Sequence, residues 1–231
     1  MYDLTVLVPF YNEETFLQKS FQRLYDSNVA EYIFLINDSS KDSSKTIAQK
    51  NADRYSNVEL FSTLSNQGKG AALSYVKEFV KTTHVAIHDA DLEYDPKDLI
   101  VLRNISIKEK DSLILGSRFI GNLERHNVYK SAFFANKFLS KFFSIINNYE
   151  VTDVATCYKI FPTKFFKNTD FYESGFSIEI EILTKFLKHN KSIFEVPITY
   201  FGRSISEGKK INIFDGFWYI FNIIRYRYKQ N

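Results

Sequence analysis

The sequence predicts an α/β fold built on a doubly wound, mostly parallel sheet with helices on both faces. Three observations predict it. Short apolar runs alternate with helical segments through the first half of the 231-residue chain. Polar residues follow the ends of three of these runs, where open α/β sheets bind ligands. The composition, 45% hydrophobic and 25% charged, is that of a globular protein. We expect one domain, residues 1–231.

Strands and helices are expected to alternate in the first half. Asp42 and Asp95 stand where helices should begin, Asp42 as an N-cap and Asp95 before Pro96 in a first helical turn. Strands are predicted at 3–10, 31–38, 57–63, 84–90 and 112–119, and helices at 13–27, 42–55, 68–82 and 95–106.

The second half is less regular and rich in aromatic residues. It predicts a helix at 128–148, a strand at 152–162, a helix at 177–190, an extended segment at 192–201, a loop at 202–211, and a C-terminal amphipathic aromatic helix within 211–231.

Two of these helices carry broad aromatic faces. Core packing against the sheet and contact with a membrane surface both explain such faces, the second with lysines reaching back toward the lipid headgroups. In the helix expected at 128–148 the face consists of Phe134, Phe138, Leu139, Phe142 and Phe143, with Lys137 and Lys141 nearby. In the C-terminal helix it consists of Phe214, Phe217, Trp218, Phe221 and Ile224, followed by Arg225, Arg227 and Lys229.

Composition limits the classes of function and the compartment. A net charge of +3 is too small to indicate a nucleic-acid partner. A single cysteine, Cys157, excludes an intramolecular disulfide and suits a reducing compartment. The N-terminus has no basic region of a signal peptide, and no segment has the roughly 20 apolar residues that span a bilayer. We expect a cytoplasmic protein, with peripheral attachment at the inner face of a membrane left open; the oligomeric state is not predicted.

The segment "HVAIHDADLEYDP" ends a buried strand in the three carboxylates Asp89, Asp91 and Glu93. In an extended segment alternate side chains point the same way, so the three groups can converge. Hard oxygen donors suit Mg²⁺ or Mn²⁺, and a diphosphate would complete the coordination. We therefore expect a divalent-metal site there.

Other phosphate and metal motifs are absent from the sequence. "NQGKGAAL" lacks the first glycine of a P-loop and the Ser or Thr after Lys69, and no dinucleotide fingerprint or zinc spacing occurs. His88, beside the acids, is interpreted as a packed neighbour rather than a base.

The motifs "VPFYNEE", "INDSSKDSS", "NQGKGAAL", "DADLEYDP", "GSRF" and "GRSISEGKKI" occur in an order that resembles family 2 glycosyltransferases. The resemblance extends over the chain and is strongest to dolichol-phosphate mannose synthase and bacterial polyprenyl-phosphate glycosyltransferases. It implies a GT-A fold, a nucleotide-diphosphate sugar donor and inverting transfer.

The resemblance also implies residue roles. Asn37 departs from the usual Asp-Asp pattern, and Glu93 stands where the mannose synthases often have Gln. The positions that hold the base and ribose in the family are matched by Pro9, Tyr11, Asn12 and Glu13, and the position that contacts the base is matched by Asp38. The segment that contacts the ribose and the metal-bound diphosphate is matched by Asp89, Ala90 and Asp91. The cations that face the diphosphate or the acceptor phosphate are matched by Arg118, Arg203 and Lys209.

The expected reaction moves a hexose from GDP-mannose or UDP-glucose to a polyprenyl or dolichyl phosphate with Mg²⁺ or Mn²⁺. The acceptor phosphate is assigned to Arg118, Lys130 and Ser131, with Arg125 as a weaker candidate. A loop over 202–211 would act as a lid. Two alternatives remain: transfer to a glycan hydroxyl, with Asp153 as a base although a structural role is preferred for it, and a non-catalytic nucleotide-sugar-binding relative.

Overall fold

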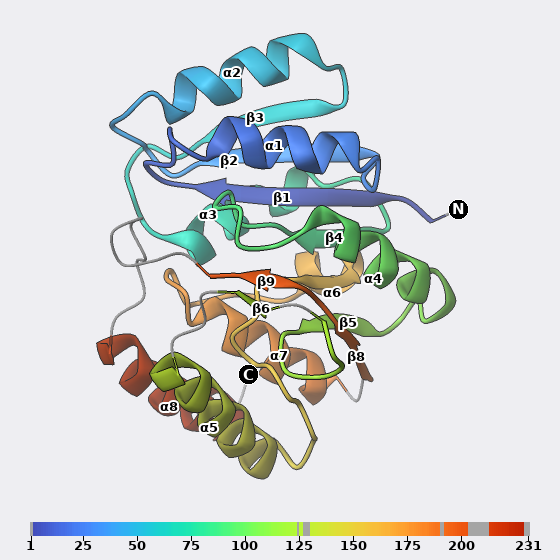
Figure 1. Ribbon diagram of the computed structural model, residues 1–231, viewed down its shortest axis with the longest axis vertical. Coiled ribbons are helices and arrows are strands. Elements are labelled where there is room, and N and C mark those ends of the chain that lie inside the picture. Colours follow the sequence, from blue (N-terminus) through green and yellow to red (C-terminus); the bar gives the residue numbers. More distant parts are fainter. Residues whose placement is uncertain (1, 124, 127–129, 190–191, 203–212, 229–231) are drawn as a thin grey trace.

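A seven-stranded mixed sheet organises the computed structural model, which describes residues 2–123, 125–126, 130–189, 192–202 and 213–228 (Figure 1). The strand order is β3-β2-β1-β4-β7-β5-β8, and β6 and β9 form a separate pair. The strands are β1 (Leu4–Phe10), β2 (Tyr32–Asn37), β3 (Val58–Ser62), β4 (His84–Ile87), β5 (Leu113–Ser117), β6 (Arg125–His126), β7 (Lys159–Pro162), β8 (Ile193–Pro197) and β9 (Tyr200–Phe201).

Helices fill most of the connections between the strands. They are α1 (Leu17–Asp26), α2 (Ser44–Arg54), α3 (Lys69–Tyr75), the 3₁₀ turn η1 (Lys77–Phe79), α4 (Pro96–Lys108), α5 (Lys130–Asn147), α6 (Thr163–Asn168), α7 (Ile178–Lys188) and α8 (Ile213–Tyr228). In Figure 1, α1 and α4 lie in front of the sheet and α3 and α6 behind it. The predicted α/β fold with helices on both faces is confirmed.

The strand pairing is parallel except around β7. This strand runs antiparallel to both β4 and β5, between which it lies, and β5 and β8 are parallel. The chain order reverses beside β1, whose neighbours are β2 and β4. An open sheet with this order forms a crevice at the carboxyl ends of β1 and β4.

Several predicted boundaries differ from the structure. The helix expected at 68–82 ends at Tyr75 and continues only as η1, and the strand expected at 152–162 is confined to β7. The short helix α6 was not predicted. Ser43 rather than Asp42 is the N-cap of α2, although the Asp42 carboxylate still accepts a hydrogen bond from the Ser44 amide at 2.9 Å. Asp95 caps α4 as expected, accepting from the Lys97 amide.

The core lies on both faces of the sheet and extends beneath α7. All of β1 is buried, as expected for a central parallel strand covered on both sides. In α7 every residue from Ile178 to Phe186 is buried, including Glu179 and Glu181. Among the described residues, no helix is long and apolar enough to cross a bilayer.

Candidate active site

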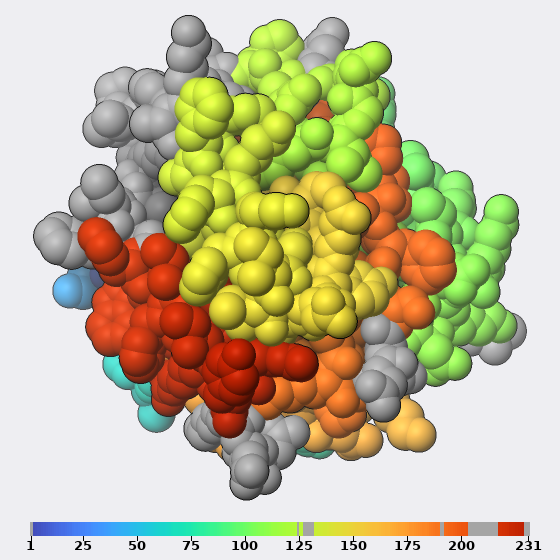
Figure 2. Space-filling view, turned by 90° about the horizontal axis from the view of Figure 1, so that it is seen from below, coloured from blue at the N-terminus to red at the C-terminus, as the bar shows by residue number. Residues whose placement is uncertain are grey.

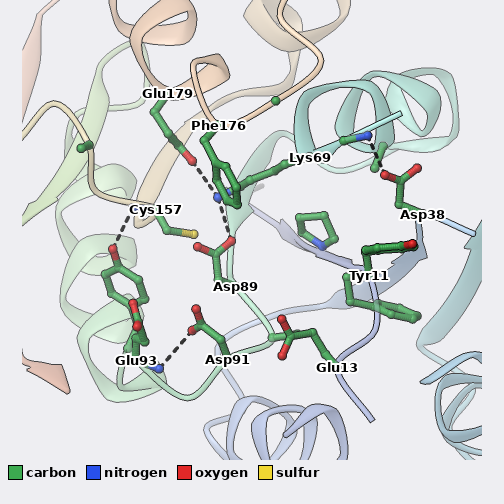
Figure 3. A pocket seen from close by; sticks show the side chains of 18 of the residues that line it. Tyr11, Glu13, Asp38, Lys69, Asp89, Asp91, Glu93, Cys157, Phe176 and Glu179 are labelled. Carbon is green, nitrogen blue, oxygen red and sulfur yellow. Dashed lines mark hydrogen bonds and ion pairs between the residues drawn. The ribbon is translucent and has the colours of Figure 1, made fainter. Parts of the chain in front are cut away.

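A pocket of about 270 Å³ opens where the carboxyl ends of the central strands meet (Figure 3). Its walls come from the segments that follow β1, β2, β4 and β5, together with the start of α3, the turn before α7, and α8. Glu13, Asp38, Asp89, Asp91 and Arg118 all line it. The clustering expected from polar strand ends is therefore present.

Three of the strand-end loops contain a non-glycine residue in the left-handed region. These residues are Asn12 after β1, Ser39 after β2 and Leu92 after β4, with φ of 53°, 60° and 66°. This conformation costs an L-residue about 1 kcal/mol or more. Strain of this kind concentrates at functional sites, where surrounding contacts hold the backbone in place. Leu92 lies between Asp91 and Glu93, so this backbone conformation occurs inside the acidic segment itself.

A chain of alternating charges, fully buried at Lys159 and partly exposed at Asp89, forms one wall of the pocket. The Lys69 ammonium lies 2.7 Å from an Asp89 oxygen and 2.7 Å from a Glu179 oxygen, and the other Glu179 oxygen pairs with fully buried Lys159. Burial opposes ionisation of Asp89, but the Lys69 charge outweighs it and holds the pKa of this carboxyl below its usual value. Burial also opposes the charge on Lys69, yet Asp89 and Glu179 raise its pKa well above the usual value. Asp89 and Lys69 are thus both charged at neutral pH.

The three carboxylates predicted to bind a metal point to different partners. Asp89 turns to Lys69, while a Glu93 oxygen accepts a hydrogen bond from the Tyr200 hydroxyl at 2.7 Å and an Asp91 oxygen accepts from the Glu93 amide at 3.1 Å. In the part of the chain that the structure describes, no three His, Cys, Asp or Glu side chains are grouped to hold a metal. The expected convergence of the trio is absent because a buried cation and a tyrosine each draw one member away.

The oxygen chemistry of the pocket still suits a hard divalent cation. Asp91 and Glu93 both line the pocket, and Figure 3 shows the Asp91 and Asp89 carboxylates facing the same space. Mg²⁺ and Mn²⁺ are commonly held by one or two carboxylates, with the remaining ligands from water and phosphate. The residues present therefore fit a cation that arrives with a diphosphate.

Arg118 is held rigidly at the end of β5. Its guanidinium makes two bonds to Asp153, at 2.7 and 2.8 Å, and lies over the Tyr200 ring at 5.0 Å from the centroid. Burial disfavours the charged guanidinium, but Asp153 more than compensates and raises the pKa of Arg118. Asp153 is completely buried and is not among the described residues that line the pocket. This arrangement fits the preferred structural role of Asp153 and leaves it no access to a substrate proton.

Asp38 shapes the loop before α3 as well as the pocket. Its carboxylate accepts hydrogen bonds from the amides of Gln67 and Gly68, the latter at 2.6 Å, and from the Thr63 hydroxyl. Asn37, the departure from the family pattern, accepts from the Ser40 amide inside its own turn. Both side chains therefore hold backbone segments of the site in place through hydrogen bonds to amides.

The glycines of "NQGKGAAL" serve close packing. Gly68 has φ of 95°, and a Cβ on Gly70 would overlap the Glu173 carbonyl oxygen. The Gly70 amide, in the first turn of α3, donates a hydrogen bond to the Ser174 carbonyl at 2.6 Å. This bond engages an amide at the start of the helix. This segment is a contact between the two halves of the chain, and the position after Lys69 has no room for the Ser or Thr of a P-loop.

His88 is a packed neighbour of the site, as expected. Its ring nitrogens lie 3.1 Å from the Ser20 hydroxyl and 2.9 Å from the Tyr158 hydroxyl. Burial lowers the pKa of His88 to about 4, so the ring is neutral near pH 7. With both nitrogens engaged by protein hydroxyls and a pKa of about 4, the ring is too weak a base to take up a proton near pH 7.

The remaining predicted residues divide into three groups. Pro9, Tyr11 and Ala90 line the pocket with Glu13. Asn12 is exposed beside the pocket, where its side-chain oxygen accepts from the Lys41 amide. Arg125 lies in β6 and is exposed. Outside the described part of the chain fall Arg203, Lys209, residues 203–211 of the lid predicted over 202–211, and the side chains of Lys130, Ser131 and Phe214.

Sequence reasoning missed several pocket residues, most of them from the second half. Tyr94 from the first half and Cys157, Phe176, Glu179 and Tyr219 from the second all line the pocket. Two signals pointed to Glu179 and Lys69: an acid inside the apolar run "SIEIEIL", and a lysine between two glycines. A charge inside an otherwise buried helix needs a partner, and that partner was the missing information.

A family model, "Glycosyl transferase family 2", matches residues 5–169. The chain belongs to this family. It is 31% identical over 141 residues to dolichyl-phosphate beta-glucosyltransferase ALG5D of Trichomonas vaginalis, covering 55% of this chain and 43% of that protein. It is 25% identical over 205 residues to low-salt glycan biosynthesis hexosyltransferase Agl6 of Haloferax volcanii, covering 87% and 48%. The chain thus spans less than half the length of these two relatives.

An uncharacterized protein of Methanocaldococcus jannaschii matches over most of both chains. It is 24% identical over 227 residues, 96% of this chain and 91% of its own. Among solved structures, glucosyl-3-phosphoglycerate synthase from Mycobacterium tuberculosis, crystallised with Mn²⁺, UDP-glucose and phosphoglyceric acid, superposes with a TM-score of 0.75 at 13% identity, covering 98% of this chain and 79% of that one. This likeness establishes the GT-A fold.

Proposed function

We propose that this family 2 glycosyltransferase moves a hexose from a nucleotide-diphosphate sugar to a polyprenyl phosphate, with inversion at the anomeric carbon. UDP-glucose is the first donor to test and GDP-mannose the second. The observation that carries the proposal is the joint presence of Glu13, Asp38, Asp91 and Arg118 around one pocket. The glucosyl donor and lipid acceptor named in the relatives support the same choice.

In this proposal the nucleoside occupies the end of the pocket nearest β1 and β2. Pro9, Tyr11 and Glu13 contact base and ribose, and Asp38 keeps the loop at Gln67 and Gly68 in place beside the base. Asp89, fixed by Lys69, faces the ribose and diphosphate. Because its direction is set by a buried ion pair, little reorganisation is needed when the donor enters.

The leaving diphosphate gains negative charge as the glycosidic bond breaks. Asp91, with Glu93 beside it, would hold Mg²⁺ or Mn²⁺, which supplies charge neutralisation to the diphosphate when bound. Arg118 contributes a permanent cation to the pocket, because Asp153 fixes its position and keeps it protonated. Charge fixed in advance stabilises the transition state more than the ground state.

A phosphate acceptor removes the need for a general base. Such an acceptor is already an anion and needs only cations that orient it opposite the leaving group. The base suggested for a hydroxyl acceptor, Asp153, is buried in a two-point ion pair with Arg118. This burial favours the lipid-phosphate acceptor over a glycan hydroxyl.

The first experiment is a thermal-shift screen of nucleotide sugars with and without Mn²⁺. A ligand that binds only the native state raises the midpoint of unfolding. Transfer is then measured with the donor that binds, using a short water-soluble prenyl phosphate and, separately, a glycan acceptor. We expect UDP-glucose to bind and the prenyl phosphate to be glycosylated. Binding without transfer would identify a non-catalytic relative, and transfer to glycan alone would overturn the acceptor assignment.

Asp91→Ala tests the catalytic assignment. We expect turnover to fall at least about a hundredfold, since charge stabilisation by one group is worth that much, with an unchanged unfolding midpoint. Asp53→Ala, which removes an exposed carboxylate on α2, is the matched control and should retain full activity. Equal rates for the two variants would remove Asp91 from the reaction.

A further inference from the structure

Two neighbouring helices, α5 and α8, each expose a stripe of apolar side chains. They lie side by side in both views, α5 in yellow and α8 in red in Figure 2. Positions i, i+4, i+7 and i+11 share one side of a helix. On α5 these positions are Phe134, Phe138, Lys141 and Ile145; on α8 they are Phe217, Phe221, Ile224 and Tyr228, all exposed.

These exposed side chains take no part in the core packing of the same helices, which other residues provide. Leu139 and Phe143 already bury one side of α5, and Ile223 and Tyr226 already bury one side of α8. Phe217 remains 68% exposed and Tyr228 70%. We call the exposed set the aromatic face; its members are Phe134, Phe138, Ile145, Phe217, Trp218, Phe221, Ile224 and Tyr228.

The aromatic face is flanked by cations. Lys137 and Lys141 on α5 and Arg225 and Arg227 on α8 are exposed, with Arg225 also paired with Glu173 at 3.2 Å, and α5 contains no acidic residue. Aromatic side chains mixed with Lys and Arg are typical of surfaces that enter the headgroup region of anionic bilayers. A symmetric contact with a second copy of the chain would instead place these cations opposite one another.

The aromatic face is also close to the pocket. On the buried side of α8, Tyr219 lines the pocket and its hydroxyl donates to the Phe176 carbonyl at 3.3 Å. Trp218, the preceding residue, belongs to the aromatic face. The two surfaces are therefore separated by the thickness of a single helix, about 10 Å.

We propose that the aromatic face docks on the surface of an anionic lipid bilayer and brings the pocket to a membrane-held acceptor. Docking itself follows from the exposed aromatic residues and cations, whereas the delivery of acceptor rests on the proposed function. The aromatic rings enter the boundary between headgroups and acyl chains, and the cations meet lipid phosphates. The described helices α5 and α8 then lie along the membrane surface.

The test is co-sedimentation with vesicles of phosphatidylcholine alone and of phosphatidylcholine mixed with phosphatidylglycerol. We expect the protein to bind the mixed vesicles and to bind less at high salt. The double variant Phe138→Ser/Phe217→Ser should reduce partitioning at least about tenfold, because two aromatic side chains leave the interface. Lys137→Gln/Lys141→Gln should remove much of the preference for anionic lipid.

The matched control is Tyr75→Ser/Phe79→Ser, which removes two half-exposed aromatic side chains from α3 and η1. It should bind vesicles as the unaltered protein does. Equal partitioning of the Phe138/Phe217 variant and the unaltered protein would overturn the proposal. So would a dimer in sedimentation velocity that this variant dissociates, with no vesicle binding.

A nucleotide-sugar thermal shift on the same samples separates the two proposals. Donor binding without vesicle binding would overturn the docking proposal and leave the proposed function standing. Vesicle binding without binding of any nucleotide sugar would do the reverse.

Discussion

The pocket and the aromatic face treat polar and apolar side chains in opposite ways. In the pocket, charged groups lie inside the protein, and Lys69, Glu179 and Lys159 each have an oppositely charged partner. On the aromatic face, large apolar side chains lie outside it beside cations. Buried charges are tolerated only when paired, so the pocket residues also hold the fold together. The aromatic face is free of that constraint.

Stability and function are therefore coupled in the pocket and separable on the aromatic face. A substitution that breaks the paired charges of Lys69, Glu179 and Lys159 in the pocket wall should damage folding and ligand binding together. A substitution on the aromatic face should alter what the protein binds and leave its unfolding unchanged. Four stability measurements, from the largest expected effect to the smallest, test this comparison.

The largest effect is expected for Glu179→Gln. It leaves Lys159 fully buried without its carboxylate partner, and breaking a buried pair in this way costs about 3 to 5 kcal/mol of unfolding free energy. Urea unfolding measures the loss. Glu59→Gln, which alters an exposed side chain on β3, should change little. Glu179→Leu/Lys159→Met, which removes both charges, should recover part of the stability; no recovery would show that the pairing is not what matters.

Gly70→Ala should follow, with a loss of about 3 kcal/mol. The added methyl would overlap the Glu173 carbonyl oxygen, so backbone must move where α3 meets the turn before α7. Gly175→Ala is the matched control, because a Cβ there meets no atom within 4 Å. Thermal unfolding of the two variants compares them directly. Similar midpoints would mean that the contact between residue 70 and residue 173 is loose.

His88 predicts a pH effect of intermediate size. Its folded pKa, about 4, lies below the unfolded value of about 6.5. Between these values the unfolded chain binds a proton that the folded chain does not, so stability is complete above pH 6.5 and falls as the pH drops toward 4, by up to about 1.4 kcal/mol per unit.

Urea unfolding of the protein and of His88→Asn at neutral pH and near pH 5 isolates this contribution. The variant should be less stable at neutral pH and should lose less on acidification. His84, whose pKa burial also lowers, is present in both proteins and cancels in the comparison. Parallel pH profiles would contradict a neutral, buried His88.

The smallest effect is expected on the aromatic face. Phe217→Ser should change the unfolding free energy by less than about 0.5 kcal/mol, the range for exposed positions. On the buried side of the same helix, Ile223→Ala should cost about 3 kcal/mol. If Phe217→Ser is as damaging as Ile223→Ala, the face is part of the core and the comparison fails.

The fold and the location of the site could be predicted from local patterns. A few adjacent residues are enough to predict the alternating strands and helices, the polar strand ends and the Asp95 cap, and the structure contains all three. The directions of the carboxylates could not be predicted this way. Asp89 turns to Lys69, which is bound by Glu179, 110 residues after Lys69, and Glu93 turns to Tyr200. Long-range pairing decides those directions, and no local spacing encodes it.

The aromatic helices show the same division. From the sequence, core packing and contact with a membrane surface were both possible explanations for Phe138 and Phe143. In the structure Phe143 is buried in the core and Phe138 is exposed on the surface. Periodicity identifies the stripes of a helix. Which stripe meets the sheet depends on how α5 and α8 are placed, which is set by the whole fold.

The place of β7 in the sheet has a consequence for synthesis on the ribosome. β7 lies between β4 and β5, although it is made after both. Until residue 162 has left the exit tunnel, each of these strands presents an unpaired edge to the cell, and such edges invite association with other chains. The nascent chain is therefore most exposed to misassembly in the interval after β5 has emerged and before β7 follows it.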